Sequence, residues 1–111
     1  MVAEYVQVQV AIDSREKAGE LARSIVESRL AACVQILGPV VSTYWWRGVM
    51  ETADEYLLLA KTTGAAVEEL TGHIRARHPY DVPEIVAVPI EHGLGEYLNW
   101  ISTETSRRSS S

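Results

Sequence analysis

Residues 31–63 read AACVQILGPVVSTYWWRGVMETADEYLLLAKTT and contain the strongest strand signal in the chain. Two runs rich in apolar, β-branched and aromatic residues flank a polar segment that contains a glycine, a pattern typical of a β-hairpin. At about 3.3 Å per residue, residues 31–47 would extend roughly 55 Å if they were straight. A domain of this length has a radius of gyration of only about 13 Å. The hairpin must therefore bend, protrude, or both.

Two local features add detail to the predicted hairpin: a bulge and a polar tip. Proline cannot donate a hydrogen bond to a sheet ladder, so Gly38-Pro39 predicts a bulge that bends the first strand. The polar residues 48–55 are expected to form the tip. There, Glu51, Asp54 and Glu55 are interpreted as charges that oppose edge-to-edge aggregation rather than as a catalytic pair.

The residues before the hairpin predict a strand followed by a helix. Residues 4–12 alternate between apolar and polar side chains, which is typical of a half-buried strand. The inward set would be Val6, Val8, Val10 and Ile12. Asp13 is expected to cap an amphipathic helix whose apolar stripe runs from Ala18 to Leu30.

The residues after the hairpin predict a helix, a strand and a second helix. The first of these helices would be capped by Thr63 and would end at His78-Pro79, because a residue before proline disfavours helical geometry. Residues 84–91 predict a strand, with Pro89 at a sheet edge or strand end. Residues 96–105 predict a short helix, with Leu94, Tyr97, Leu98 and Ile101 on its packed side.

This order of elements predicts an α+β fold of the ferredoxin-like βαββαβ type, with a four-stranded antiparallel sheet and two helices on one face. The long hairpin would protrude from the centre of the sheet, and the last helix would be an addition at the C-terminus. Residues 1–105 are expected to form one domain, and the serine-rich residues 106–111 a disordered tail. A fold of this kind does not by itself specify a function.

Composition narrows the functional classes. The chain has 111 residues, of which 47% are hydrophobic and 23% charged, and its formal net charge of −5 argues against binding to nucleic acid or anionic membranes. No apolar run is long enough to span a bilayer, and no signal peptide is evident, so a cytoplasmic location is expected. Cys33 is the single cysteine, which excludes an internal disulfide and a paired-thiol metal site such as that of a small copper chaperone.

Five phrases in the chain resemble, in order and spacing, the CutA family of divalent-cation tolerance proteins. They are RLAACV at residues 29–34, YWWRG at 44–48, the segment 55–63 that ends in KTT, HPYDVPEI at 78–85 and YLNW at 97–100. The resemblance implies a ferredoxin-like fold, a homotrimer, a cytoplasmic bacterial protein and a non-catalytic role in tolerance of divalent metals, copper above all. Some family members are described as binding copper through a cysteine before the first helix and a histidine pair before Pro-Tyr. Here those positions read Ile12-Asp13-Ser14 and Arg77-His78, so a thiol-based copper site is in doubt.

The aromatic run Tyr44-Trp45-Trp46 has two interpretations, a ligand platform or a packing surface. A protruding strand pair cannot bury both of its faces in so small a domain, and exposed aromatic side chains of this size would rival the largest apolar patch of a typical monomer. Tryptophan and tyrosine are enriched at protein interfaces, so we expect neighbouring subunits to cover them. The predicted trimer interface comprises Val40, Tyr44, Trp45, Trp46 and Trp100.

The predicted metal ligands are His78, Asp13 and His92. His78 could bind a divalent cation with Asp13 or with a carboxylate from another subunit, or it could instead satisfy the last carbonyls of the helix that it ends. His92 lies beside Glu91 and Glu96 and is interpreted either as a weak cation ligand or as a solvated turn residue. Any metal is expected to bind weakly, and no organic cofactor is expected.

A cleft between subunits is predicted to be lined by Lys61, Tyr80 and Glu84. Lys61 lies on a mostly apolar strand, so we expect it to pair with Glu84 or Glu55, with anion binding as the alternative. Cys33 is interpreted as an inert, buried small hydrophobe, with a metal or redox role as the alternative. A small ligand or a metal in this cleft would give either a metal-tolerance protein or, on fold analogy alone, a trimeric sensing module of the nitrogen-regulatory type. Catalysis is not expected, because neither a glycine-rich anion loop nor a Ser-His-Asp arrangement is evident.

Overall fold

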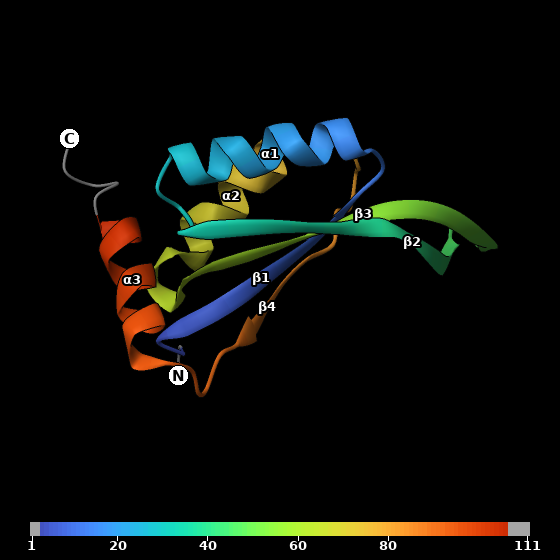
Figure 1. The fold of residues 1–111 in the computed structure, drawn as a ribbon. Coiled ribbons are helices and arrows are strands. Elements are labelled where there is room, and N and C mark those ends of the chain that lie inside the picture. The colour runs from blue at the N-terminus through green and yellow to red at the C-terminus, as the bar shows by residue number, and fades with distance from the viewer. Residues whose placement is uncertain (1–2, 107–111) are drawn as a thin grey trace.

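The computed structural model describes residues 3–106 and contains one four-stranded antiparallel sheet with helices packed on it (Figure 1). The elements in chain order are β1 (Tyr5–Ile12), α1 (Arg15–Glu27), β2 (Cys33–Trp46), β3 (Val49–Thr63), a 3-10 turn (Gly64–Ala66), α2 (Val67–Arg77), β4 (Ile85–Pro89) and α3 (Gly95–Ser106). The strands lie in the order β2-β3-β1-β4, which is the ferredoxin-like arrangement. The hairpin is not centred in the sheet: β3 is internal, but β2 forms an edge.

The core lies between the sheet and the helices α1 and α2. The predicted inward residues of β1 are all buried, and they pack against apolar residues of α1, α2 and β3. The helices contribute mainly Ala18, Leu21, Ile25, Leu70 and Ile74. None of the helices within residues 3–106 combines the length and apolar character needed to cross a bilayer.

The ends of α1 differ from the prediction by a residue or two. Ser14, not Asp13, is the N-cap, and its Oγ accepts the backbone N–H of Lys17 at 3.1 Å. Asp13 instead lies 3.5 Å from the Lys17 ammonium, one turn along the helix. The helix ends at Glu27 because Arg29 adopts a φ of 62°, which reverses the chain and leaves Leu30 buried beyond the helix.

The hairpin contains the predicted bulge and a tighter turn than predicted. The ladder between β2 and β3 shifts register between Leu37 and Val40, at Gly38-Pro39. The turn consists of Arg47 and Gly48 alone, whose φ values of 52° and 81° suit a two-residue hairpin connection. The tip predicted at residues 48–55 is therefore wrong, since these residues lie almost entirely in β3.

The C-terminal part follows the predicted order with two corrections. Thr63 makes no side-chain capping bond, and the 3-10 turn separates it from α2. In α3 the buried residues are Ile101 and Thr105, whereas Leu94 and Tyr97 are exposed, so its packed side was only partly predicted. Pro89 ends β4, an edge strand, as expected. Ser106 belongs to α3, and the rest of the predicted tail lies outside the described residues.

Candidate functional site

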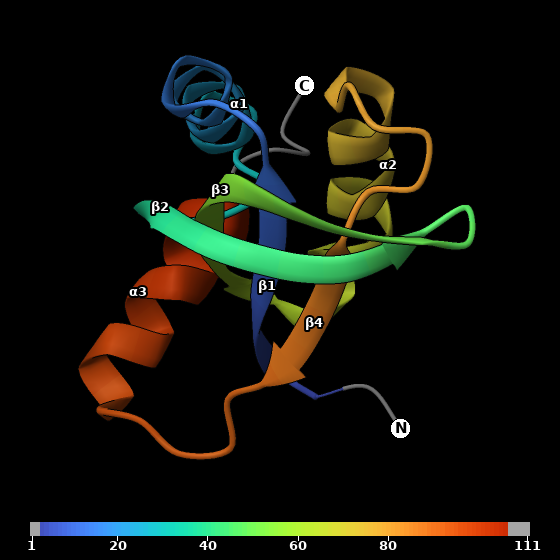
Figure 2. The ribbon, with the colours of Figure 1, turned by 90° about the vertical axis from the view of Figure 1, so that its right-hand side faces the viewer.

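The outer half of the hairpin, residues 40–55, is called the arm. It leaves the rest of the molecule beyond the first turn of α1 (Figure 1), and it contributes to a longest dimension of 44 Å. In the view of Figure 2 the hairpin crosses in front of β1 and β4. Side chains alternate along each strand of the arm and partners in the ladder share a face, so the arm has two distinct faces.

The two faces of the arm differ in exposure. The outer face carries Val41, Trp45 and Met50, which are 71%, 73% and 64% exposed. The inner face carries Tyr44 and Trp46, at 39% and 38%, and ends in Glu55, a carboxylate only 9% exposed. Aromatic residues therefore occur on both faces. The inner face also carries Val49, which is 57% exposed, but the most exposed apolar side chains are on the outer face.

His78 follows α2 and is buried, with 9% of its surface exposed. Its Nε2 lies 2.7 Å from the carbonyl oxygen of Ala11, so this nitrogen carries a proton and donates. Its Nδ1 accepts the backbone N–H of Tyr80 at 3.2 Å. The ring is thus a neutral imidazole with both nitrogens engaged. The predicted contact with the last carbonyls of α2 is not made, because the ring turns to β1 instead.

Tyr80 and Glu55 form the polar contact next to His78. The Tyr80 hydroxyl donates to Oε2 of Glu55 at 2.9 Å, and its ring meets the imidazole of His78 edge-on at 4.7 Å. Burial raises the pKa of Tyr80 well above its usual value, and the hydrogen bond and negative charge of Glu55 raise it further, so the hydroxyl remains a donor at neutral pH. Sequence reasoning missed this role of Glu55. The placement of an acid directly before the apolar run that begins at Tyr56 was the available signal.

The structure does not bring the three predicted metal ligands together. His78 contacts the end of β1 at Ala11, whereas the chain at Ile90, just before His92, bonds to the start of β1 at Tyr5. Tyr5 and Ala11 are six positions apart along β1, or roughly 20 Å. Asp13 lies on the His78 side, near enough for its charge to raise the pKa of Tyr80, but it interacts with Lys17. Within residues 3–106, no three His, Cys, Asp or Glu side chains are grouped so as to hold a metal ion.

The predicted cleft residues also have separate partners. Lys61 donates to Oε1 of Gln35 at 2.7 Å, and Glu84 accepts from Nε2 of Gln9 at 2.8 Å. The expected pairing of Lys61 with Glu84 or Glu55 is therefore wrong within this chain. Cys33 pairs with Lys61 in the β2–β3 ladder and is half-buried rather than fully buried.

A serine–histidine pair that the sequence did not suggest joins α1 to α2. Ser24 Oγ and His73 Nε2 lie 3.0 Å apart, and the same hydroxyl donates to the carbonyl of Leu21 at 2.9 Å. Since the single hydroxyl proton goes to Leu21, His73 donates to Ser24 and does not act as its base. Burial lowers the pKa of His73 and the charge of Arg77 lowers it further, partly opposed by Glu69. This pair connects two helices and is not an activated nucleophile.

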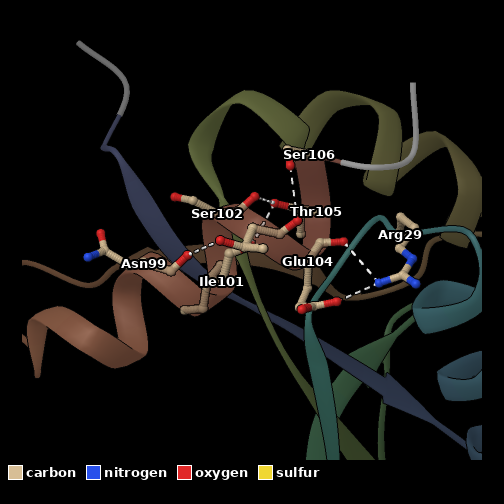
Figure 3. A network of polar contacts seen from close by, with 8 residues as sticks. Arg29, Asn99, Ile101, Ser102, Glu104, Thr105 and Ser106 are labelled. Carbon is tan, nitrogen blue, oxygen red and sulfur yellow. Dashed lines mark hydrogen bonds and ion pairs between the residues drawn. The ribbon is translucent and has the colours of Figure 1, made fainter. Parts of the chain in front are cut away.

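A second polar network fixes α3 at the other end of the molecule (Figure 3). Arg29, in its left-handed conformation, lies 2.6 Å from Oε1 of Glu104, and the buried Thr105 hydroxyl donates to the carbonyl of Ile101. Tyr5 also reaches Ser102 with a 2.6 Å hydrogen bond. Trp100, a predicted interface residue, packs beside Tyr97 with ring centroids 5.5 Å apart and remains 40% exposed.

The family model described as CutA1 divalent ion tolerance protein matches residues 6–104. The chain belongs to the CutA1 family. The family model and the relative from Thermus thermophilus are named for tolerance of divalent cations.

Individual relatives support the assignment over nearly the whole chain. The divalent-cation tolerance protein CutA of Thermus thermophilus is 46% identical over 98 residues, covering 88% of this chain and 95% of that protein. Protein CutA 1, chloroplastic, of Oryza sativa subsp. japonica is 43% identical over 88% of this chain, but the match spans only 55% of the rice protein. The chain therefore corresponds to about half the length of this plant relative. The crystal structure of CutA from Xylella fastidiosa superimposes with a TM-score of 0.89 at 40% identity, covering 93% of this chain and 99% of that one.

Proposed function

We propose that this CutA1-family protein is a non-catalytic homotrimer that acts in tolerance of divalent cations and binds them weakly. The observation that carries the assembly is the outer face of the arm, where Val41, Trp45 and Met50 are each more than 60% exposed. A tryptophan side chain buries about 150–250 Å², so this face approaches the roughly 300–600 Å² of the largest apolar patch on a typical monomer. Three copies of this chain, each covering the arm of the next, would remove that surface from water.

The test of assembly is Trp45→Asp, because a carboxylate on the outer face would have to be buried unpaired in the interface. We expect sedimentation to show a trimer for the natural chain and a subunit affinity weakened roughly 30-fold or more for the variant. Val26→Asp is the control, because Val26 is 40% exposed near the end of α1, away from the arm and from the predicted cleft, and it should leave the trimer intact. A monomeric natural chain at micromolar concentration would contradict the proposed assembly.

For the cation, we propose His92 as the accessible ligand among the three predicted residues. Within residues 3–106, His92 is exposed and makes no hydrogen bond or ion pair, whereas His78 and Asp13 would first have to give up their contacts. A single exposed imidazole suits a borderline cation such as copper or zinc, and only at low affinity, because no three such ligands are grouped within residues 3–106. Calorimetry with copper, zinc and cadmium on tag-free protein should show weak saturable binding that His92→Ala reduces and His78→Gln does not.

The remaining parts of the proposal concern chemistry and location. Two contacts support the absence of catalysis. The Ser24 hydroxyl donates its proton to the Leu21 carbonyl and not to His73, so the serine is not activated. The Tyr80 hydroxyl donates to Glu55. We place the protein in the cytoplasm on the sequence features described above, although the rice relative is named as chloroplastic and the Archaeoglobus fulgidus structure as periplasmic. If a thermal-shift screen found stabilisation by nucleotides or metabolites and none by metals, the sensing alternative would replace cation tolerance.

A further inference from the structure

The joint between the arm and the sheet is the least regular part of the ladder. Pairing stops after Leu37↔Leu57 and resumes at Val40↔Glu55, so Gly38 and Pro39 interrupt it. The backbone there is closely packed: a Cβ on Gly38 would lie 2.8 Å from Cδ2 of Tyr56 and 3.0 Å from the carbonyl oxygen of Glu55. Because ladder hydrogen bonds are interrupted at this joint, other contacts must contribute to fixing the direction in which the arm leaves the sheet.

Residues 78–81 supply two such contacts, one at each end of the arm. At the joint, the Tyr80 hydroxyl donates to Glu55, the first arm residue on β3 to resume pairing after the bulge. At the turn, the carboxylate of Asp81 lies 3.6 Å from the guanidinium of Arg47, which also stacks 5.2 Å from the Trp46 ring. Figure 2 shows the same relation at the level of the ribbon, with the hairpin turn on the side of the loop that connects α2 to β4.

The two contacts differ in how much they are expected to stabilise the arm. The Tyr80–Glu55 bond is charge-assisted and joins a carboxylate that is 9% exposed, so its loss would leave a buried charge without its hydrogen bond. The Asp81 and Arg47 side chains are both more than 70% exposed, and an ion pair of that kind contributes little by itself. The contact at the joint therefore dominates.

Residues 78–81 are themselves fixed to the body of the molecule. The imidazole of His78 bridges the Ala11 carbonyl at the end of β1 and the backbone N–H of Tyr80. Glu55, on β3, is thus connected to the neighbouring internal strand β1 through Tyr80 and His78, and not only through the ladder of its own strand. The aromatic edge contact between His78 and Tyr80 restricts the orientation of both rings.

We propose that residues 78–81 act as a brace that holds the arm in its direction, with Tyr80 as the positioning residue that acts on Glu55. The brace goes beyond the proposed assembly, because it operates within one subunit. It assigns the HPYD part of the chain to control of the arm, where sequence reasoning placed it in a metal site or a cleft.

Hydrogen–deuterium exchange of the folded, full-length chain tests the brace. Tyr80→Phe removes the hydroxyl and keeps the ring on His78, and Glu55→Met removes the acceptor at similar length. Each variant should accelerate exchange of the arm amides roughly 3- to 10-fold and leave β1 unchanged. The double variant should show no more than the larger single effect, because both changes remove the same contact. Tyr5→Phe, which deletes the tyrosine hydroxyl that reaches Ser102, is the matched control and should not affect the arm.

Three results would overturn the brace. These are unchanged arm exchange in both single variants, equal acceleration over the whole chain, and multiplication of the two effects in the double variant. The comparison is made between variants in the same oligomeric state. A monomeric natural chain would therefore contradict the proposed trimer and leave this test valid.

Discussion

The two ends of the β2–β3 hairpin have similar apolar content and opposite surroundings. At the inner end, Leu58 and Ala60 are fully buried beneath the helices. At the outer end, Val41 and Trp45 continue the same ladder, and no helix or strand within residues 3–106 covers them. The difference arises because α1 and α2 cover the inner end of the hairpin but do not extend over the arm (Figure 1). An apolar strand pattern therefore predicts that a surface will be covered, but not which molecule covers it.

Substitution in the two regions should give the largest contrast. Ile74→Ala removes a fully buried side chain from α2, and we expect the free energy of unfolding to fall by about 2–5 kcal/mol. Val41→Ala, its counterpart on the arm, should cost little within one subunit and act on assembly instead. Urea denaturation at two protein concentrations separates them: only the Val41→Ala effect should depend on concentration. Equal, concentration-independent losses would remove the distinction between body and arm.

The joint between the regions should be more sensitive to an added methyl group than the turn at the end of the arm. Gly38→Ala adds a Cβ against Tyr56 and Glu55 at a φ of 144°, so we expect a loss of roughly 2–4 kcal/mol. A Cβ at Gly48 would meet no other atom within 4 Å, so Gly48→Ala has only the φ of 81° against it, and we expect the free energy of unfolding to fall by about 1–2 kcal/mol. Thermal unfolding of both variants measures the difference, and a Gly48 effect as large as that of Gly38 would show that packing at the joint is unimportant.

Protonation of His73 should have the smallest effect on stability, and this effect should arise at the contact between α1 and α2 rather than in the arm. The pKa of His73 is lowered below 6.5 in the folded chain, so the unfolded chain binds the proton first as the pH falls. Stability should therefore decline slightly from about pH 6.5 downwards, until the folded His73 is protonated as well. His73→Gln keeps a donor for Ser24 and should flatten this part of the pH profile. A profile that is the same in both proteins would assign the decline to other groups.

The fold was largely predictable because its main signals are local. Alternation at Val6, Val8 and Val10 and the proline after His78 each act over a few residues, and the structure confirms both. The prediction of the hairpin tip failed although the signal that determines the turn is also local. Polar residues after Gly48 suggested a long tip, whereas positive φ values at Arg47 and Gly48 close the turn in two residues.

The candidate site was less predictable because its contacts depend on register and on distant segments. Lys61 bonds to Gln35 because β2 and β3 pair in one particular register, and no property of Lys61 alone specifies that partner. His78 bonds to a backbone carbonyl 67 residues away, and a carbonyl has no signature in the sequence. The apolar character of the arm was predicted, but the division into an outer face and a braced inner face requires the three-dimensional structure.

Both ring nitrogens of the neutral His78 imidazole are hydrogen-bonded, and this has a thermodynamic consequence for cation binding. Any cation that took one of its nitrogens would displace either the Ala11 carbonyl or the Tyr80 amide, and with it the support of the arm. By reciprocity, whatever fixes the arm would then weaken binding at His78 by the same factor. A tightly closed assembly and an occupied His78 would therefore be competing states of one equilibrium.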